Sequence, residues 1–156
     1  MKNSETDHRS GLDRFVYYFL TVLIPAGIII DALLPWIMRY LVDGAQTMAD
    51  QQYRLLVLPI MAAGIFAIMI LWELHRIMKT VVSGNCFISD NVERLHHLGV
   101  YALIIFVIVL LRCLIFPTLT AVTITAVFLI AGLFSFVLER VFRQAVSYKE
   151  DDDLTI

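Results

Sequence analysis

Side chains that could bind a metal or react as nucleophiles gather around one polar stretch, residues 78–98, in the middle of an apolar chain. They are His75, Cys86, His96 and His97. Imidazole and thiolate groups are zinc ligands, and a hairpin in this stretch would bring them near one another. Their spacing, however, matches no CxxC or HxxxH pattern, and adjacent histidines point to different faces of a helix. We therefore expect solvated histidines at helix ends, with no metal site and no cofactor.

Asp31 and Arg112 are the two charged residues that lie well inside long apolar runs. A charge at depth in a bilayer costs about 2.5–3.5 kcal/mol unless it is paired or hydrated. Two arrangements satisfy this requirement. The residues form an ion pair that holds the first and third helices together, or they line a polar cavity, open to the outside, that receives a ligand or ion. No third intramembrane acid accompanies them as a proton relay would require.

The composition is that of an integral membrane protein. Of the 156 residues 60% are hydrophobic, and the mean hydropathy is +0.80; soluble domains are only about 45–50% apolar. The net charge of −2 provides no basic field for direct binding of nucleic acid. The sequence contains no nucleophile elbow and no glycine-rich phosphate loop, so we expect no catalytic residues and no enzyme activity.

Four apolar segments have about the 20 residues that a helix needs to cross the hydrocarbon core. They predict an all-α fold, one domain over residues 1–156, built as a bundle of four transmembrane helices at residues 15–38, 55–74, 100–116 and 119–137. The second helix should continue past the membrane until Gly84 stops it. Ser89 or Asp90 should cap the third helix, because Asp90 and Glu93 have the spacing of a capping box. Helices two and three then project into the cytoplasm.

The distribution of lysine and arginine predicts the orientation. In a four-span protein one side holds the N-terminus, the central loop 78–98 and the C-terminal tail 143–156, together with the helix ends beside them. This side carries most of the lysine and arginine residues, whereas only Arg39 and Arg54 fall on the other side. The basic residues of the first side are Lys2, Arg9, Arg14, Arg76, Lys79, Arg94, Arg140, Arg143 and Lys149. Positive loops stay inside, so both termini and the central loop should be cytoplasmic. Cys86 and Cys113 would then lie on opposite sides and form no disulfide.

Two motifs resemble a known family. The first, SGNCFISDNVERL, contains Gly84, Phe87, Asn91 and Leu95, although Cys86 stands where the family usually has proline. The second combines Gly132-Leu133-Phe134 and Phe142 with an acidic residue and a final Leu154-Thr155-Ile156. Both resemble the bacterial family catalogued as domain of unknown function 2975, small four-span membrane proteins. The resemblance implies a multi-pass protein of the bacterial cytoplasmic (inner) membrane whose biochemical role is undefined.

Members of that family are often encoded beside a small helix-turn-helix regulator. The resemblance thus implies a non-catalytic regulatory protein that presents its loop motif and its tail, Asp153, Leu154, Thr155 and Ile156, to such a partner. Alternatively the tail docks on its own loop, with Asp153 on Arg94 or Arg76 and Leu154 over Phe87. A second hypothesis for function is a small oligomeric transporter or channel that uses Asp31 and Arg112. Small residues on the fourth helix permit self-association, and they permit packing within the chain equally well.

Overall fold

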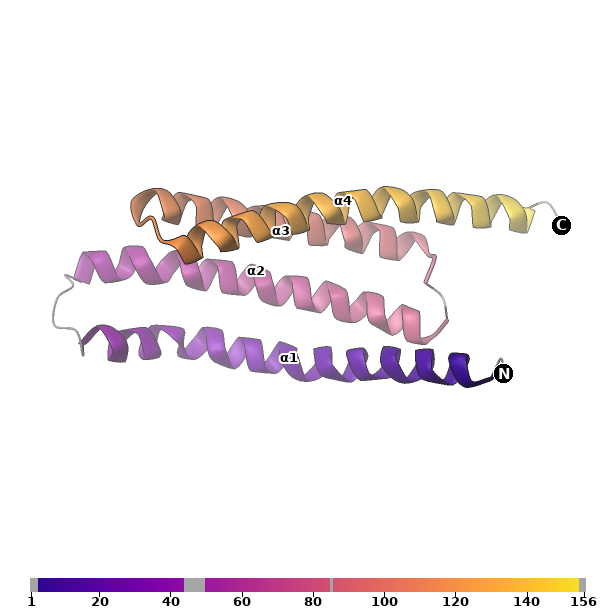
Figure 1. Ribbon diagram of the computed structural model, residues 1–156, viewed down its shortest axis with the longest axis horizontal. Coiled ribbons are helices and arrows are strands. Elements are labelled where there is room, and N and C mark those ends of the chain that lie inside the picture. The colour runs from indigo at the N-terminus through magenta and orange to yellow at the C-terminus, as the bar shows by residue number, and fades with distance from the viewer. Residues whose placement is uncertain (1–2, 44–49, 85, 155–156) are drawn as a thin grey trace.

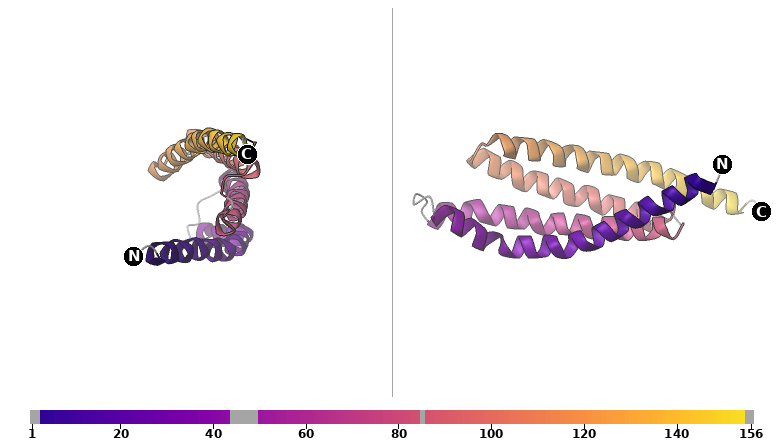
Figure 2. Two further views of the ribbon diagram at one scale, coloured as in Figure 1. Left: turned by 90° about the vertical axis from the view of Figure 1, so that its right-hand side faces the viewer. Right: turned by 60° about the horizontal axis from the view of Figure 1, so that its bottom comes forward.

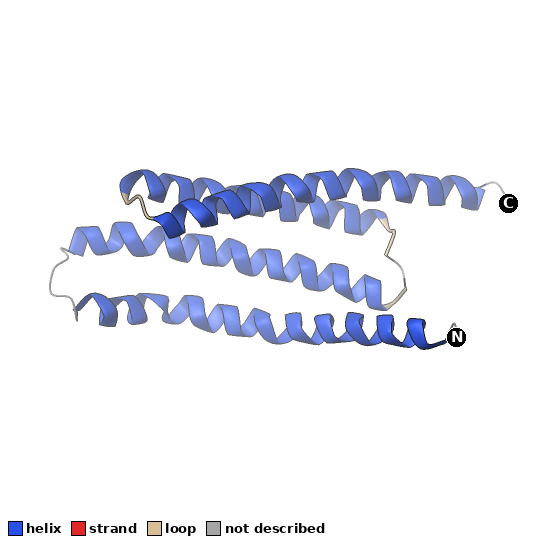
Figure 3. Cartoon of the chain, viewed as in Figure 1, coloured by secondary structure: helices blue, strands red, loops and turns tan. Residues whose placement is uncertain are grey.

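The fold is entirely helical in the part of the chain that the structure, a computed structural model, describes: residues 3–43, 50–84 and 86–154. Helices and short connections account for all of it (Figure 3). The helices are α1 (Asn3–Asp43), α2 (Asp50–Val82), α3 (Ser89–Ile115) and α4 (Leu119–Leu154). All four are long and apolar enough to cross a membrane, and large hydrophobic side chains cover their outer surfaces. The prediction of an all-α membrane protein with four spans is confirmed.

The four helices run antiparallel and pack in chain order. Helix α1 packs on α2, α2 on α3 and α3 on α4, and within the described ranges no other pair of helices is in contact. Seen along their length, the helices form an arc that is open on one side, rather than a closed square (Figure 2). The start of α1, the end of α4 and the turn between α2 and α3 lie at the same end of the molecule (Figure 1).

The turn between α2 and α3 contains the only glycine with positive φ among the described residues. Gly84 has φ +82°, a backbone conformation that other residues adopt at a cost, and its N–H donates to Val81 O at 3.0 Å. The sequence correctly placed the end of the second helix here. Helix α2 continues to Val82, beyond the predicted span end at residue 74, and α3 begins at Ser89, ahead of residue 100. On which side of the membrane these extensions lie stays a prediction.

The capping prediction for α3 is wrong. The N-cap residue is Ile88, in extended conformation, and no side chain caps the helix. The Asp90 carboxylate instead accepts hydrogen bonds from Nε and Nη2 of Arg94, at 3.1 and 2.6 Å. Asp90 is the second residue of the helix and so lies past the N-cap position, and Arg94, one turn along, provides two charged donors for its carboxylate.

Helices α3 and α4 approach most closely at two glycines. A Cβ atom added to Gly132 would lie 2.9 Å from Leu103 Cδ2 and 3.3 Å from Gly99 O, and one added to Gly99 would lie 3.0 Å from the Phe136 ring. Gly132 and Ala121 are buried, whereas Ala126 and Ala131 are exposed. At Gly132, therefore, the small residue permits packing within the chain.

Candidate functional site

The loop motif positions the turn between α2 and α3 through Asn91. This residue is fully buried, and its Nδ2 donates to Thr80 Oγ1 at 2.7 Å and to Cys86 O at 2.8 Å. Thr80 in turn donates to Ile77 O, which anchors the cluster to α2. Because one amide joins the end of α2, the loop and the first turn of α3, the turn has a defined shape.

Two further motif residues attach this turn to α4. Leu95 is buried in a cluster with Ile77 and Leu98, and Phe142 of α4 packs against it. The ring of Phe87 lies 5.4 Å from the ring of Phe142, centroid to centroid. The loop motif and the Phe142 part of the C-terminal motif, more than forty residues apart in sequence, thus meet at one end of the molecule.

Glu73 of α2 is held by two side chains from α3. Arg94 Nη1 lies 3.1 Å from Glu73 Oε2, and His97 Nδ1 lies 3.7 Å from Glu73 Oε1. The Arg94 and Glu73 side chains are only 14% and 13% exposed. Since Arg94 also pairs with Asp90, this cation is shared between two carboxylates.

Glu139 of α4 has a similar environment on the opposite face of α3. Its Oε2 lies 2.8 Å from His96 Nδ1 and its Oε1 lies 2.5 Å from Arg143 Nη2. The adjacent histidines therefore reach in opposite directions, His97 to the carboxylate on α2 and His96 to the carboxylate on α4. They are partly exposed, as expected, but each also connects α3 to a neighbouring helix.

The histidines and Cys86 do not converge. Among the residues whose side chains the structure describes, no three His, Cys, Asp or Glu form a group that could hold a metal ion. His75 lies apart from the others, with its ring stacked 4.6 Å from that of Tyr17 on α1. Its role in the structure is to join α1 to α2.

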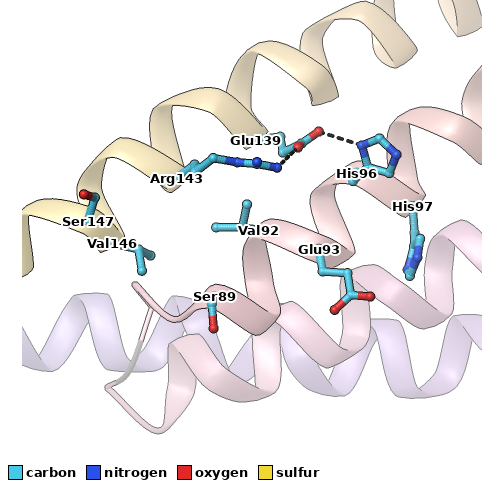
Figure 4. Close-up of a pocket in the computed structure, with 9 residues that line it drawn as sticks. All are labelled: Ser89, Val92, Glu93, His96, His97, Glu139, Arg143, Val146 and Ser147. Carbon is cyan, nitrogen blue, oxygen red and sulfur yellow. Dashed lines mark hydrogen bonds and ion pairs between the residues drawn. The ribbon is translucent and has the colours of Figure 1, made fainter. Parts of the chain in front are cut away.

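A groove of about 590 Å³ lies between the first turns of α3 and residues 139–147 of α4 (Figure 4). The His96–Glu139–Arg143 cluster forms its upper wall, and Val92 and Val146 form its apolar floor. Ser89, Glu93 and Ser147 line its rim and are exposed. The groove thus combines an apolar surface with side chains of both charges.

Asp31 and Arg112 line a second cavity, of about 520 Å³, nearer the opposite end of the molecule. All four helices contribute to it, and most of its surface is apolar. The two residues share the cavity, but no ion pair between them is found among the described salt bridges. The Asp31 carboxylate lies directly against Gly64 of α2, and Arg112 Nε is buried without a hydrogen-bond partner in the described chain. Whether they act as a charge pair stays a prediction.

Comparison with known proteins identifies the family. The sequence model of the family described as protein of unknown function, DUF2975, matches residues 36–156. The chain belongs to this family. No curated protein and no solved structure matches the chain. The DUF2975 match begins after Asp31 and includes Arg112, both glycines of the α3–α4 crossing, and the two motifs that meet at Phe142.

The DUF2975 motif residues have different places in the structure. Gly84 forms the turn, and Asn91 and Leu95 are buried, whereas Phe87 is 46% exposed. Helix α4 includes Asp153 and Leu154, but their side chains, together with Thr155 and Ile156, lie outside the described residues. Docking of the tail on the loop or on a partner therefore stays a prediction.

The candidate residues found from the sequence do not include the two carboxylates that pair at this end, Glu73 and Glu139. The spacing of Glu139 and Arg143, one helical turn apart, was the available signal. The pairing of Glu73 with Arg94 had no such signal, because the residues belong to different helices.

Proposed function

We propose that this DUF2975 protein is a non-catalytic regulatory membrane protein whose polar end, formed by the α2–α3 turn and the last turns of α4, docks a cytosolic protein. The groove between α3 and α4 is the observation that supports this function. Its walls are fixed by the Asn91 hydrogen bonds and by the ion pairs of Glu139, so a partner would meet a preformed surface.

The chemistry of this end favours a small basic partner such as a helix-turn-helix regulator. Glu93 is exposed at the groove, and the sequence ends in an acidic run, Glu150 to Asp153. A DNA-binding protein carries a basic surface that these acids would attract. The exposed part of Phe87 and the tail residue Leu154 would supply apolar contacts. Binding would hold the regulator at the cytoplasmic face of the inner membrane.

Affinity capture from solubilised membranes tests this proposal. The wild-type protein should retain a small protein that binds DNA when it is released. Glu93→Arg should lower its recovery at least about tenfold, because a like charge then faces the basic surface. Removal of residues 150–156 should have a similar effect.

Gln144→Arg is the matched control, since Gln144 is exposed on α4 and does not line the groove. It introduces the same arginine side chain outside the groove and should leave recovery unchanged. Equal recovery with all variants, or capture only of proteins that do not bind DNA, would contradict the proposal.

A small transporter or channel, oligomeric in the membrane, is the second candidate, and the location of Asp31 and Arg112 in one cavity favours it. Under this hypothesis Asp31→Asn alters the flux of an ion or solute into proteoliposomes, while Glu93→Arg does not. Unchanged flux with Asp31→Asn would leave partner docking as the function.

A further inference from the structure

The cavity between the helices is mostly apolar and has a few polar groups in its lining. Arg112, Asp31 and Thr120 supply its polar groups, whereas Ile60, Ile105 and Phe128 belong to its apolar surface. Its volume of about 520 Å³ is within the usual range of about 300–1,000 Å³ for ligand sites. The apolar surface is extensive enough for hydrocarbon, and the polar groups would then determine which head group accompanies it.

The polar groups of this cavity have unmet bonding capacity. Arg112 Nε is buried, and among the described residues nothing accepts a hydrogen bond from it. Asp31 lies against the backbone of Gly64 and makes no ion pair with Arg112. Buried polar atoms in proteins nearly always have hydrogen-bond partners. A ligand with both an anionic and a cationic group would complement both residues.

The position of these charges corresponds to the head-group region of a bilayer. Arg112 lies in the last turn of α3. On α1, Asp31 is followed by Trp36 and Tyr40, whose side chains are exposed. Exposed tryptophan and tyrosine near the ends of membrane helices mark the membrane–water interface. The cavity's polar groups thus lie within reach of phosphate and ammonium groups, with its apolar surface toward the acyl chains.

The open side of the arc determines which molecules can enter. Helices α1 and α4 both line the cavity, but they do not pack on each other anywhere in the described ranges. Figure 2 shows the gap between them along the helix axes. In a membrane this side faces lipid, so a bilayer molecule enters without passing through water.

We infer that the cavity binds a zwitterionic phospholipid with a primary ammonium head group. The phosphate accepts hydrogen bonds from the Arg112 guanidinium, the ammonium donates to the Asp31 carboxylate, and an acyl chain lies along the apolar surface. The site is remote from the groove of the polar end and does not depend on partner docking.

Native mass spectrometry of the purified full-length protein tests this inference. The protein is exchanged into mixed micelles that contain equal amounts of phosphatidylethanolamine, phosphatidylglycerol and diacylglycerol with identical acyl chains. The wild type should retain phosphatidylethanolamine at least about tenfold more than either of the others. This measurement on the unaltered protein needs no variant to fold.

The two charges should contribute to selectivity in different ways. Asp31→Asn should remove the preference for phosphatidylethanolamine over phosphatidylglycerol, because these lipids differ at the ammonium group. Arg112→Gln should lower retention of both phospholipids to that of diacylglycerol, which lacks the phosphate. Arg54→Gln, an exposed arginine of α2 outside the cavity, should behave as the wild type. Circular dichroism verifies that each variant is folded.

Other results would overturn the inference. Equal retention of the three lipids by the wild type would show that the two charged residues do not select between head groups. A site that binds free leucine, a water-soluble zwitterion, and no phospholipid would be a solute site. A dimer without bound lipid would show that a second copy of the chain covers the cavity.

Discussion

Asn91 joins three segments of the chain through two hydrogen bonds donated by one side chain. Thr80 belongs to α2, Cys86 to the connection and Asn91 itself to the first turn of α3. The amide is fully buried, so water cannot replace a lost bond without opening the turn. The attachment of the turn to α2 therefore depends strongly on this one side chain.

Asn91→Ala should lower the stability of the protein by about 1–3 kcal/mol, the usual cost of removing a buried hydrogen-bonding group. Thermal unfolding in detergent measures the loss. Labelling of Cys86 by a maleimide should also become faster, because its carbonyl is no longer held by Asn91. Gln144→Ala, an exposed amide on α4, is the control and should change neither quantity. An unchanged unfolding temperature with Asn91→Ala would show that the bonds are dispensable.

Gly84→Ala tests the backbone of the same turn. Gly84 has positive φ with open space around it, so a methyl group costs conformational energy alone, about 1–2 kcal/mol. Gly11 is helical, with nothing within 4 Å of an added Cβ, and Gly11→Ala should instead be neutral or stabilising. The unfolding temperatures of the two variants should thus move apart. A similar change in both would contradict a conformational role for Gly84.

Some of these residues could be found from sequence and others could not. Gly84 follows an uninterrupted helical run and precedes a polar stretch, a local pattern that identifies a helix end. Asp90 has the spacing of a cap, yet the helix already begins at Ser89, and the Asp90 carboxylate bonds to Arg94 instead. The role of Asn91 depends on Thr80, eleven residues earlier, and becomes visible only once the turn is closed.

Helix α3 connects the other elements, because it packs on both α2 and α4. Its adjacent histidines and Arg94 extend to carboxylates on both neighbours. Exposure determines which of these pairs matters most for stability. The pair of Arg94 with Glu73 is largely shielded from water, whereas the Arg143 side chain is 70% exposed.

Arg94→Met should therefore cost more stability than Arg143→Met. Removal of Arg94 leaves Glu73 as a shielded carboxylate without its closest cation, which costs about 3–5 kcal/mol in comparable sites. Removal of Arg143 also leaves a shielded carboxylate, but Glu139 keeps His96 at 2.8 Å, and the lost partner is itself solvated, so the loss should be nearer about 1 kcal/mol. Thermal unfolding of both variants under identical conditions provides the comparison. Equal losses would show that the exposure of the two pairs has no bearing on their strength.

The crossing of α3 and α4 should tolerate no added volume at Gly132. A side chain there meets Leu103 and the Gly99 carbonyl, so Gly132→Val should destabilise by about 1–3 kcal/mol. The neighbouring Ala131 is exposed on the surface of α4, and Ala131→Val should be tolerated. The sequence identified a set of small residues on this helix, but not which of them faces α3. If both valine variants unfold at the same temperature, the crossing does not depend on Gly132.

At the scale of the whole molecule, the orientation in the membrane is open to direct measurement. The excess of basic residues around both termini and the central loop predicts that Cys86 faces the cytoplasm. In a Cys113→Ala variant, a membrane-impermeant maleimide should label Cys86 in inside-out vesicles and not in intact cells. The reverse pattern would refute the positive-inside assignment for this chain.

The fold class follows from the sequence because hydropathy and length are properties of each segment by itself. Four long apolar helices with short connections were predictable for that reason, and the structure contains them. Their arrangement as an open arc was not, since side chains from different helices decide it. The cavity that Asp31 and Arg112 share illustrates what the sequence can and cannot predict. Each residue can be identified as a charge in its own apolar segment, but only the arrangement of the helices places the two together.

The packing of the helices in chain order has a consequence for biosynthesis. In the part of the chain that the structure describes, each helix docks only on its neighbours in sequence. Each newly inserted segment therefore finds its binding surface already in the bilayer, and no early helix must be kept apart until a late one arrives. Contacts between neighbours in sequence also close short loops, which favours rapid assembly. The protein can assemble stepwise as the ribosome delivers it, and α4 completes the cavity last.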